Sequence, residues 1–234
     1  MDIILVPGFW LDGAAWDEVA PVLTRAGHAP RPVTLPGLES VDADRSGVTL
    51  SDHVDAVVGA IDAADGPVVL VGHSAGGGLV YAAADQRPDR VERVVYVDSG
   101  PFADGQAVNS ELPDEVVDQP LPAWDEFEDG EPTGLTDDQL ARFRQRSVPQ
   151  PAATAREPHH LIGDAEVRRA VPATVIACLL PGEVLRDLMA RDHPFVRELK
   201  TLKDYEIVDL PTGHWPMFTR PSELGETIAA AVSR

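Results

Sequence analysis

Cysteine is almost absent from this sequence: Cys178 is the single one among 234 residues. One thiol cannot form a disulfide within the chain, and it cannot alone supply the thiolates of a zinc site. No apolar run approaches the roughly 18 residues of a membrane-spanning helix. The first residues, MDIILV, carry neither the basic segment nor the cleavage site of a secretory signal. We therefore expect a cytoplasmic protein without a disulfide or a bound metal.

Basic residues are also scarce, since 19 Lys and Arg stand against 39 Asp and Glu and give a net charge of −20. A surface of that charge repels phosphate backbones and anionic lipid, which argues against nucleic acid and membranes as partners. We expect a small-molecule substrate, bound by a monomer or a homodimer. The remaining composition, 44% apolar and 25% charged, is that of a globular protein, and the length suits one compact domain.

Apolar runs predict six strands, and amphipathic segments between them predict helices. The expected strands are residues 2–6, 31–35, 67–71, 91–97, 173–180 and 205–210. Helices are expected between them, for example at 75–85, and after the last strand at 221–232. Strands that alternate with helices at this spacing form a parallel sheet with helices on both faces. The sequence therefore predicts an α/β fold.

The alternation stops between residues 101 and 170, a segment rich in proline and acidic residues with no strong strand pattern. Residues 104–138 include 12 Asp or Glu and no Lys or Arg. We interpret residues 1–100 and 171–234 as the core and 101–170 as an insertion between two strands. The insertion is either a solvated surface segment or a helical lid. We favour the lid, because ligands in open α/β sheets bind beyond the carboxyl ends of the strands.

The motif Gly72-His73-Ser74-Ala75-Gly76 lies where an expected strand ends and a helix begins. In this context Gly-x-Ser-x-Gly is typical of a tight turn that presents a serine hydroxyl at the end of a sheet. The following helix N-terminus favours negative charge that develops nearby. A glycine-rich turn that only serves packing is the alternative, but the strand and helix around the motif favour Ser74 as a nucleophile.

With these motifs the chain resembles the α/β-hydrolase family over nearly its whole length. The resemblance rests on Pro7-Gly8-Phe9-Trp10, on GHSAGG at 72–77 and on Gly213-His214-Trp215. Their order, nucleophile before histidine, is the order of that fold. The chain looks like a short member that begins at the family's third strand, which implies about six parallel strands.

The resemblance also implies an oxyanion hole made by the backbone N–H groups of Phe9 and Ala75. The family's His-Gly pair after the first strand is Pro7-Gly8 here. This departure leaves the oxyanion hole intact, because the contributing N–H belongs to the residue that follows the pair.

A serine hydroxyl needs a neighbouring base to attack a carbonyl. Of seven histidines, we expect His214 to be that base, because it follows the last strand at the sheet edge that also carries Ser74. His73 is expected to point away and to be structural. His159 and His160 lie in the insertion, where His159 is expected to line the pocket. The remaining three are expected at the surface, namely His28, His53 and His193.

The acid that orients His214 has two candidates. Most family members place it after the next-to-last strand, but Pro181 occupies that position here and Glu183 comes slightly late. Asp98 ends the preceding strand, 24 residues after Ser74, a position that some resembling enzymes use. We favour Asp98 and keep Glu183 as the alternative.

These residues predict hydrolysis of an ester through an acyl-enzyme on Ser74. The substrate is expected to be a neutral, small-to-medium ester, thioester or lactone, because the acidic insertion disfavours anions. No glycine-rich nucleotide motif is present, so we expect no cofactor. The expected pocket residues are Trp10, Trp124, Phe127, Phe143, His159 and Trp215.

Two other functions remain open. The same Ser-His pair serves as an acid–base system in some resembling lyases and cofactor-free enzymes, although those often have a lid Lys and this insertion has none. A non-hydrolytic receptor or signalling protein on the same fold is the third possibility, because a fold alone does not fix function.

Overall fold

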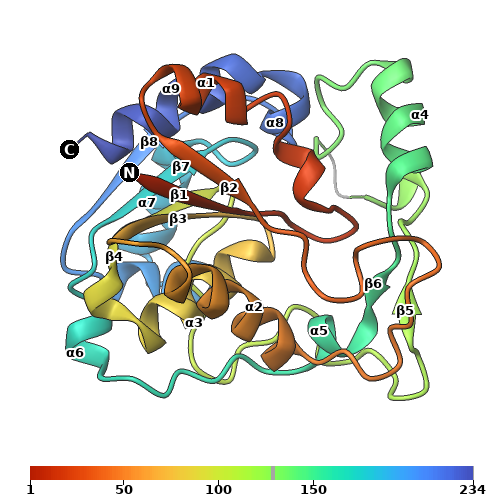
Figure 1. Ribbon diagram of the computed structural model, residues 1–234, viewed down its shortest axis with the longest axis horizontal. Coiled ribbons are helices and arrows are strands. Elements are labelled where there is room, and N and C mark those ends of the chain that lie inside the picture. Colours follow the sequence, from red (N-terminus) through yellow and green to blue (C-terminus); the bar gives the residue numbers. More distant parts are fainter. Residues whose placement is uncertain (128–129, 234) are drawn as a thin grey trace.

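The computed structural model describes residues 1–127 and 130–233 and contains a six-stranded parallel sheet (Figure 1). Every neighbouring pair of its strands is parallel. The strands, in their order across the sheet, are β2 (Ala29–Pro32), β1 (Asp2–Val6), β3 (Val68–His73), β4 (Val91–Val97), β7 (Ala173–Ala177) and β8 (Tyr205–Asp209). The sequence-based prediction of an α/β fold with six parallel strands is confirmed.

Helices cover both faces of the sheet because both faces are apolar. Along β1, Ile4 and Val6 pack into one core cluster, whereas Ile3 and Leu5 pack into the other. Side chains of a strand point alternately to opposite faces, so a strand buried on both sides reads as a continuous apolar run. One face is covered by α2 (Leu50–Asp62), α3 (Gly76–Gln86) and α7 (Gly182–Ala190), and the other by α1 (Ala20–Arg25), α8 (Pro216–Thr219) and α9 (Pro221–Val232).

Residues 101–170 form short elements joined by long loops. They are β5 (Asp118–Gln119), α4 (Asp137–Arg146), β6 (Gln150–Pro151), α5 (Ala152–Arg156) and α6 (Ala165–Arg168). In Figure 1, α4, β5 and β6 lie beyond the end of the sheet that is opposite the N-terminus. That this segment acts as a lid, and that it is a unit separate from the core, stay predictions. Two of its acidic residues, Glu128 and Asp129, lie outside the described residues.

No helix in the described part of the chain combines the length and apolar character needed to cross a bilayer.

Candidate active site

Ser74 lies on the turn between β3 and α3 with a φ angle of +52°. Residues other than glycine seldom adopt this left-handed conformation, so the turn is strained. The positions two residues before and two residues after Ser74 must be glycine. A Cβ on Gly72 would lie 2.5 Å from the carbonyl oxygen of Gly76, and a Cβ on Gly76 would lie 2.7 Å from the carbonyl oxygen of Pro7. The turn therefore holds the Ser74 hydroxyl at the carboxyl end of β3.

The imidazole of His214 lies between Ser74 and Asp98. His214 Nε2 is 2.9 Å from Ser74 Oγ, and His214 Nδ1 is 2.6 Å from Asp98 Oδ2. Because a carboxylate only accepts hydrogen bonds, Nδ1 carries the ring proton and donates it, and Nε2 accepts from the serine hydroxyl. The structure thus brings together the three residues that the sequence singled out as nucleophile, base and acid.

The alternative acid, Glu183, is not part of this arrangement. It lies exposed in the first turn of α7. Asp98 is instead fixed against the end of β7, because its Oδ1 accepts hydrogen bonds from the backbone N–H groups of Cys178 at 3.1 Å and Leu179 at 2.9 Å. These two bonds leave Oδ2 to face His214.

The main chain of His214 is held on both sides. His73 Nε2 lies 2.7 Å from the carbonyl oxygen of His214, and the N–H of His214 donates to the carbonyl of Glu131 in the insertion at 2.9 Å. Burial and, to a lesser extent, the nearby His214 together lower the pKa of His73 to about 3, so the His73 ring is neutral and its Nε2 donates. His73, expected to be structural, thus fixes the loop that carries His214.

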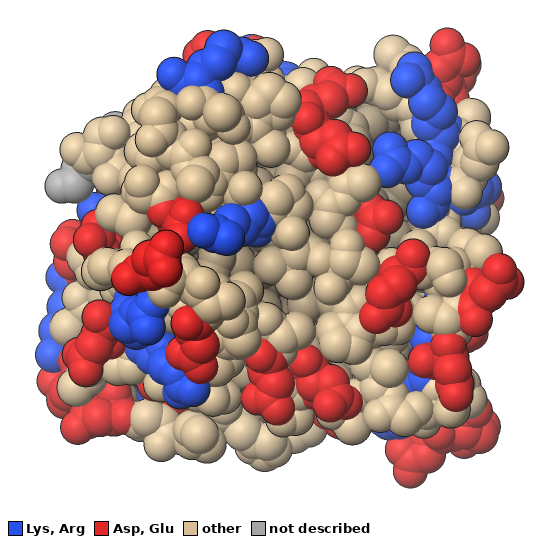
Figure 2. Space-filling view, viewed as in Figure 1, with Lys and Arg blue, Asp and Glu red and all other residues tan. Residues whose placement is uncertain are grey.

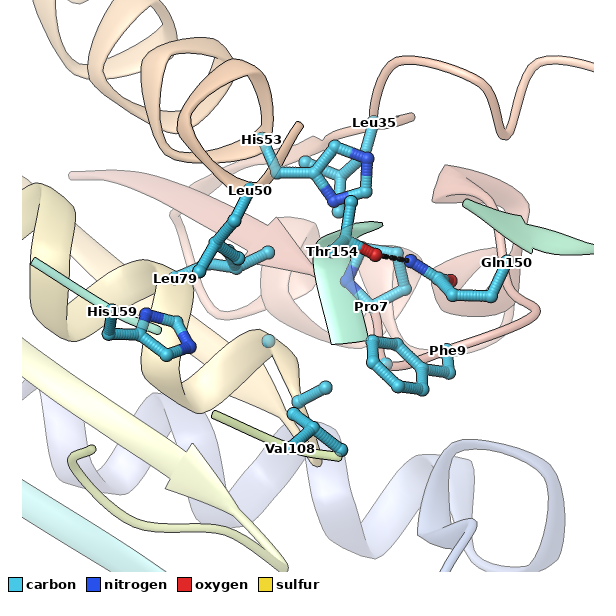
Figure 3. Close-up of a pocket in the computed structure, with 13 residues that line it drawn as sticks. Pro7, Phe9, Leu35, Leu50, His53, Leu79, Val108, Gln150, Thr154 and His159 are labelled. Atoms are coloured by element: carbon cyan, nitrogen blue, oxygen red, sulfur yellow. Dashed lines mark hydrogen bonds between the residues drawn. The ribbon is translucent and has the colours of Figure 1, made fainter. Parts of the chain in front are cut away.

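Phe9 and Ala75, whose backbone N–H groups are the expected oxyanion donors, both line a narrow pocket, which Figure 3 shows with Phe9 labelled. No group in the described parts of the chain accepts a hydrogen bond from either of them. Ala75 is the N-cap of α3, where the helix dipole adds a partial positive charge. Two unpaired donors beside the nucleophile suit an oxygen that becomes negative.

The pocket continues from Ala75 between α2, α3 and the insertion. Its apolar lining includes Pro7, Leu35, Leu50, Leu79 and Val108, and its polar lining is His53, Gln150, Thr154 and His159. Of the residues expected in a substrate pocket, His159 lines this one. Sequence reasoning missed the other three polar residues.

The prediction that His53 lies at the surface is wrong. Its polar neighbours in the sequence suggested that position, but the residue is only 1% exposed. It lies on the buried face of α2, three residues after Leu50 and four before Val57. Residues three and four apart share a helix face, so this spacing was an overlooked signal of burial.

The five expected aromatic residues lie together in a cluster and do not line the pocket of Figure 3. Ring centroids are 5.7 Å apart for Trp10 and Phe127, 5.4 Å for Trp124 and Phe143, and 5.1 Å for Phe143 and Trp215. The edge-to-face geometry of these pairs is favourable for aromatic rings. Trp215 also contacts the ring of His214, 5.2 Å away. The cluster packs the insertion onto the core beside His214, and its contact with substrate stays a prediction.

The described residues, 1–127 and 130–233, contain no group of three His, Cys, Asp or Glu side chains placed to hold a metal ion.

The chain is similar to known proteins along nearly its whole length. The chain is 28% identical over 257 residues to a carbendazim hydrolyzing esterase of Nocardioides sp. strain SG-4G, covering 98% of each chain. It is 25% identical over 250 residues to a pyrethroid hydrolase of Sphingobium wenxiniae, covering 97% of this chain and 86% of that protein. An extracellular alpha/beta-hydrolase from a Paenibacillus species has the same fold, with a TM-score of 0.77 at 23% identity over 99% of this chain and 98% of that one. The model of the alpha/beta hydrolase family matches residues 3–227, and the chain therefore belongs to that family.

Proposed function

We propose that this protein hydrolyses a small-to-medium, neutral carboxylic ester through an acyl-enzyme on Ser74. The observation that carries the proposal is the hydrogen-bonded series from Asp98 through His214 to Ser74, beside two unpaired backbone N–H groups. The names of the two similar proteins, an esterase and a pyrethroid hydrolase, support the reaction class. Thioesters and lactones belong to the same proposal, because their carbonyl carbon undergoes the same attack.

In the first half of the reaction the Ser74 oxygen attacks the ester carbonyl carbon while its proton moves to His214 Nε2. The carbonyl oxygen becomes negative and accepts hydrogen bonds from the N–H groups of Phe9 and Ala75. His214, now positively charged, is stabilised by Asp98. It then gives its proton to the alcohol oxygen as the bond between that oxygen and the carbonyl carbon breaks, which leaves Ser74 acylated.

In the second half a water molecule gives a proton to His214 and attacks the acyl-enzyme. The oxyanion again lies against the two N–H groups, and the proton returns to Ser74 as the acid leaves. The protein needs no external oxidant or reductant for either half. Asp98 keeps its role throughout, because it holds the ring proton on Nδ1 and so keeps Nε2 available.

The charge of the insertion supports a neutral substrate. Figure 2 shows acidic side chains gathered over β5 and the loops near it, and basic side chains gathered over α4. An anionic ester that approaches past β5 is repelled.

Hydrolysis of p-nitrophenyl esters of increasing chain length by wild type and Ser74→Ala tests the proposal. We expect turnover of short and medium chains by wild type and a loss of several orders of magnitude in the variant. Ser110→Ala, at an exposed serine of the insertion, should retain wild-type turnover. Near-native hydrolysis by Ser74→Ala would contradict the nucleophile, and no hydrolysis of any ester by wild type would favour a receptor or another reaction.

A further inference from the structure

The ring of His159 is buried at the pocket without a hydrogen-bond partner. The residue is 2% exposed, and no group in the described parts of the chain forms a hydrogen bond with its ring nitrogens. Burial and, to a lesser extent, His160 together lower its pKa to about 4, so the ring is neutral near pH 7. A neutral imidazole has one N–H donor and one bare nitrogen acceptor. Buried polar groups are normally paired, so this ring is placed to bond a small polar group, and the cavity of about 10 Å³ beside it has room for a group about the size of a water or a hydroxyl.

The position of this ring relative to Ser74 is set by α3. The ring packs against Gly78, where a Cβ would lie only 2.6 Å from His159 Nε2, and against the edge of Phe102 at 4.9 Å between centroids. Gly78 follows Ser74 by four residues. Because α3 begins at Gly76, Gly78 lies in its first turn, and the imidazole that packs on Gly78 lies at the end of α3 that follows the Ser74 turn.

The other polar side chains of the pocket bond to the protein itself. Gln150 Oε1 accepts from the N–H of Trp10 at 3.3 Å, and Gln150 Nε2 donates to Thr154 Oγ1 at 2.7 Å. Thr154 Oγ1 in turn donates to the carbonyl of Pro151 at 2.7 Å. His53 Nε2 donates to the carbonyl of Pro36, 2.8 Å away. Among the described residues that line the pocket, His159 is thus the polar side chain with no partner at all.

Figure 3 shows His159 on one side of the pocket, opposite Thr154 and Gln150, with Leu50, Leu79, Val108 and Phe9 around the space between them. A charged group in such a lining would lose its hydration without gaining a counter-ion, which is costly. A hydroxyl is neutral and both donates and accepts, so it suits either tautomer of the ring.

We propose that His159 binds a neutral hydroxyl on an otherwise apolar arm of the substrate. The inference rests on the proposed function, because it names the substrate class of the same site. His159 acts here as a residue that determines specificity and takes no part in proton transfer.

Two matched pairs of esters test the proposal and show which side of the ester carries the arm. Methyl 3-hydroxyphenylacetate against methyl phenylacetate places the hydroxyl on the acyl side. The esters 3-hydroxybenzyl acetate and benzyl acetate place it on the alcohol side. We expect kcat/KM for wild type to be about tenfold higher for the hydroxylated member of one pair, the gain of one good hydrogen bond.

Variants connect this preference to the ring. His159→Leu should reduce the ratio within that pair to about one, and His159→Gln, which keeps a donor and an acceptor, should retain part of it. His160→Leu at the exposed neighbour is the matched control and should keep the wild-type ratio. Circular dichroism checks that each variant is folded. If His159→Leu does not fold, the kcat/KM ratio within the ester pair is compared between His159→Gln and His160→Leu. A lower ratio in His159→Gln supports the proposal, and equal ratios overturn it.

Equal rates within both pairs for wild type, or an unchanged ratio in folded His159→Leu, would overturn this inference and leave ester hydrolysis standing. Hydrolysis of no ester at all would instead contradict the proposed function, and this inference with it.

Discussion

Asp98 Oδ2 lies 2.6 Å from His214 Nδ1, although the two residues are 116 positions apart and Asp98 directly follows β4. Its φ angle of +45° turns the chain sharply at the strand end. At the corresponding end of β7 the chain has Pro181 and Gly182, and the N–H of Gly182 donates to Asp209 at 2.6 Å. No carboxylate therefore stands among residues 178–182, which follow β7. The end of that strand instead supplies the backbone N–H groups of Cys178 and Leu179, which hold Asp98 in place after β4.

Asp98→Asn should lower kcat/KM for p-nitrophenyl acetate about 10³- to 10⁴-fold, because an amide that donates to Nδ1 favours the wrong imidazole tautomer. Glu183→Gln should change it by less than about tenfold. Steady-state kinetics with circular dichroism as a folding check measures both. The reverse ranking of the two variants would show that Glu183 is the orienting acid.

Gly76→Ala should destabilise the protein by about 1–3 kcal/mol, because the new Cβ would lie 2.7 Å from the carbonyl oxygen of Pro7. Gly59 is exposed in the middle of α2, and a Cβ there would meet no other segment of the protein within 4 Å. Gly59→Ala should therefore stabilise by about 0.5–1 kcal/mol, since alanine favours helices. Urea denaturation measures both, and equal effects would contradict the account of the turn at Ser74.

Stability should fall as the pH is lowered from about 6.5 toward 3, partly because of His73. Burial lowers the pKa of this ring in the folded state, so over this window the unfolded chain binds a proton that the folded chain does not. Each pH unit then costs about 1.4 kcal/mol of unfolding free energy.

In His73→Gln this contribution is absent, so its stability between pH 6.5 and 4.5 should fall less steeply than that of wild type. Urea denaturation at several pH values gives the slopes, and His160→Gln at an exposed position is the control that should keep the wild-type slope. Equal slopes for wild type and His73→Gln would show that His73 is not buried in its neutral form.

Arg168→Leu should destabilise the protein by about 3–5 kcal/mol, because it leaves the carboxylate of Asp85 buried without its partner. Arg168 Nη1 lies 2.5 Å from Asp85 Oδ1, with side chains 7% and 0% exposed, and Arg168 Nε also donates to the hydroxyl of Tyr81 at 3.1 Å. Arg31→Leu removes one partner of an exposed pair, with Asp2, and should leave the urea midpoint almost unchanged. Similar urea midpoints for the two variants would show that the buried pair of Arg168 and Asp85 contributes no more to stability than the exposed pair.

The sheet was predictable because its central strands are buried on both faces over most of their length and are therefore largely apolar. The turn at Ser74 was predictable for a related reason, since its steric limits require glycine at Gly72 and Gly76. Such constraints act between residues close in sequence, and a single sequence displays them directly.

The pocket was less predictable, because contacts between distant segments decide it. Gln150 and Thr154 lie in an insertion without a clear pattern, and only the folded chain brings Gln150 to the N–H of Trp10, 140 residues away. Aromatic residues beside the catalytic loops suggested a pocket, but they bury most of their surface against one another, as Trp215 does at 2% exposure.

Every step of the proposed reaction depends on the Ser74 oxygen as the nucleophile and on His214 as the base that activates it. Reaction with a fluorophosphonate probe, followed by mass spectrometry of the digested protein, tests these two roles most directly. We expect one adduct, on Ser74, formed rapidly in wild type, much more slowly in His214→Ala and not at all in Ser74→Ala. An adduct on another residue, or labelling of folded His214→Ala at the wild-type rate, would contradict them.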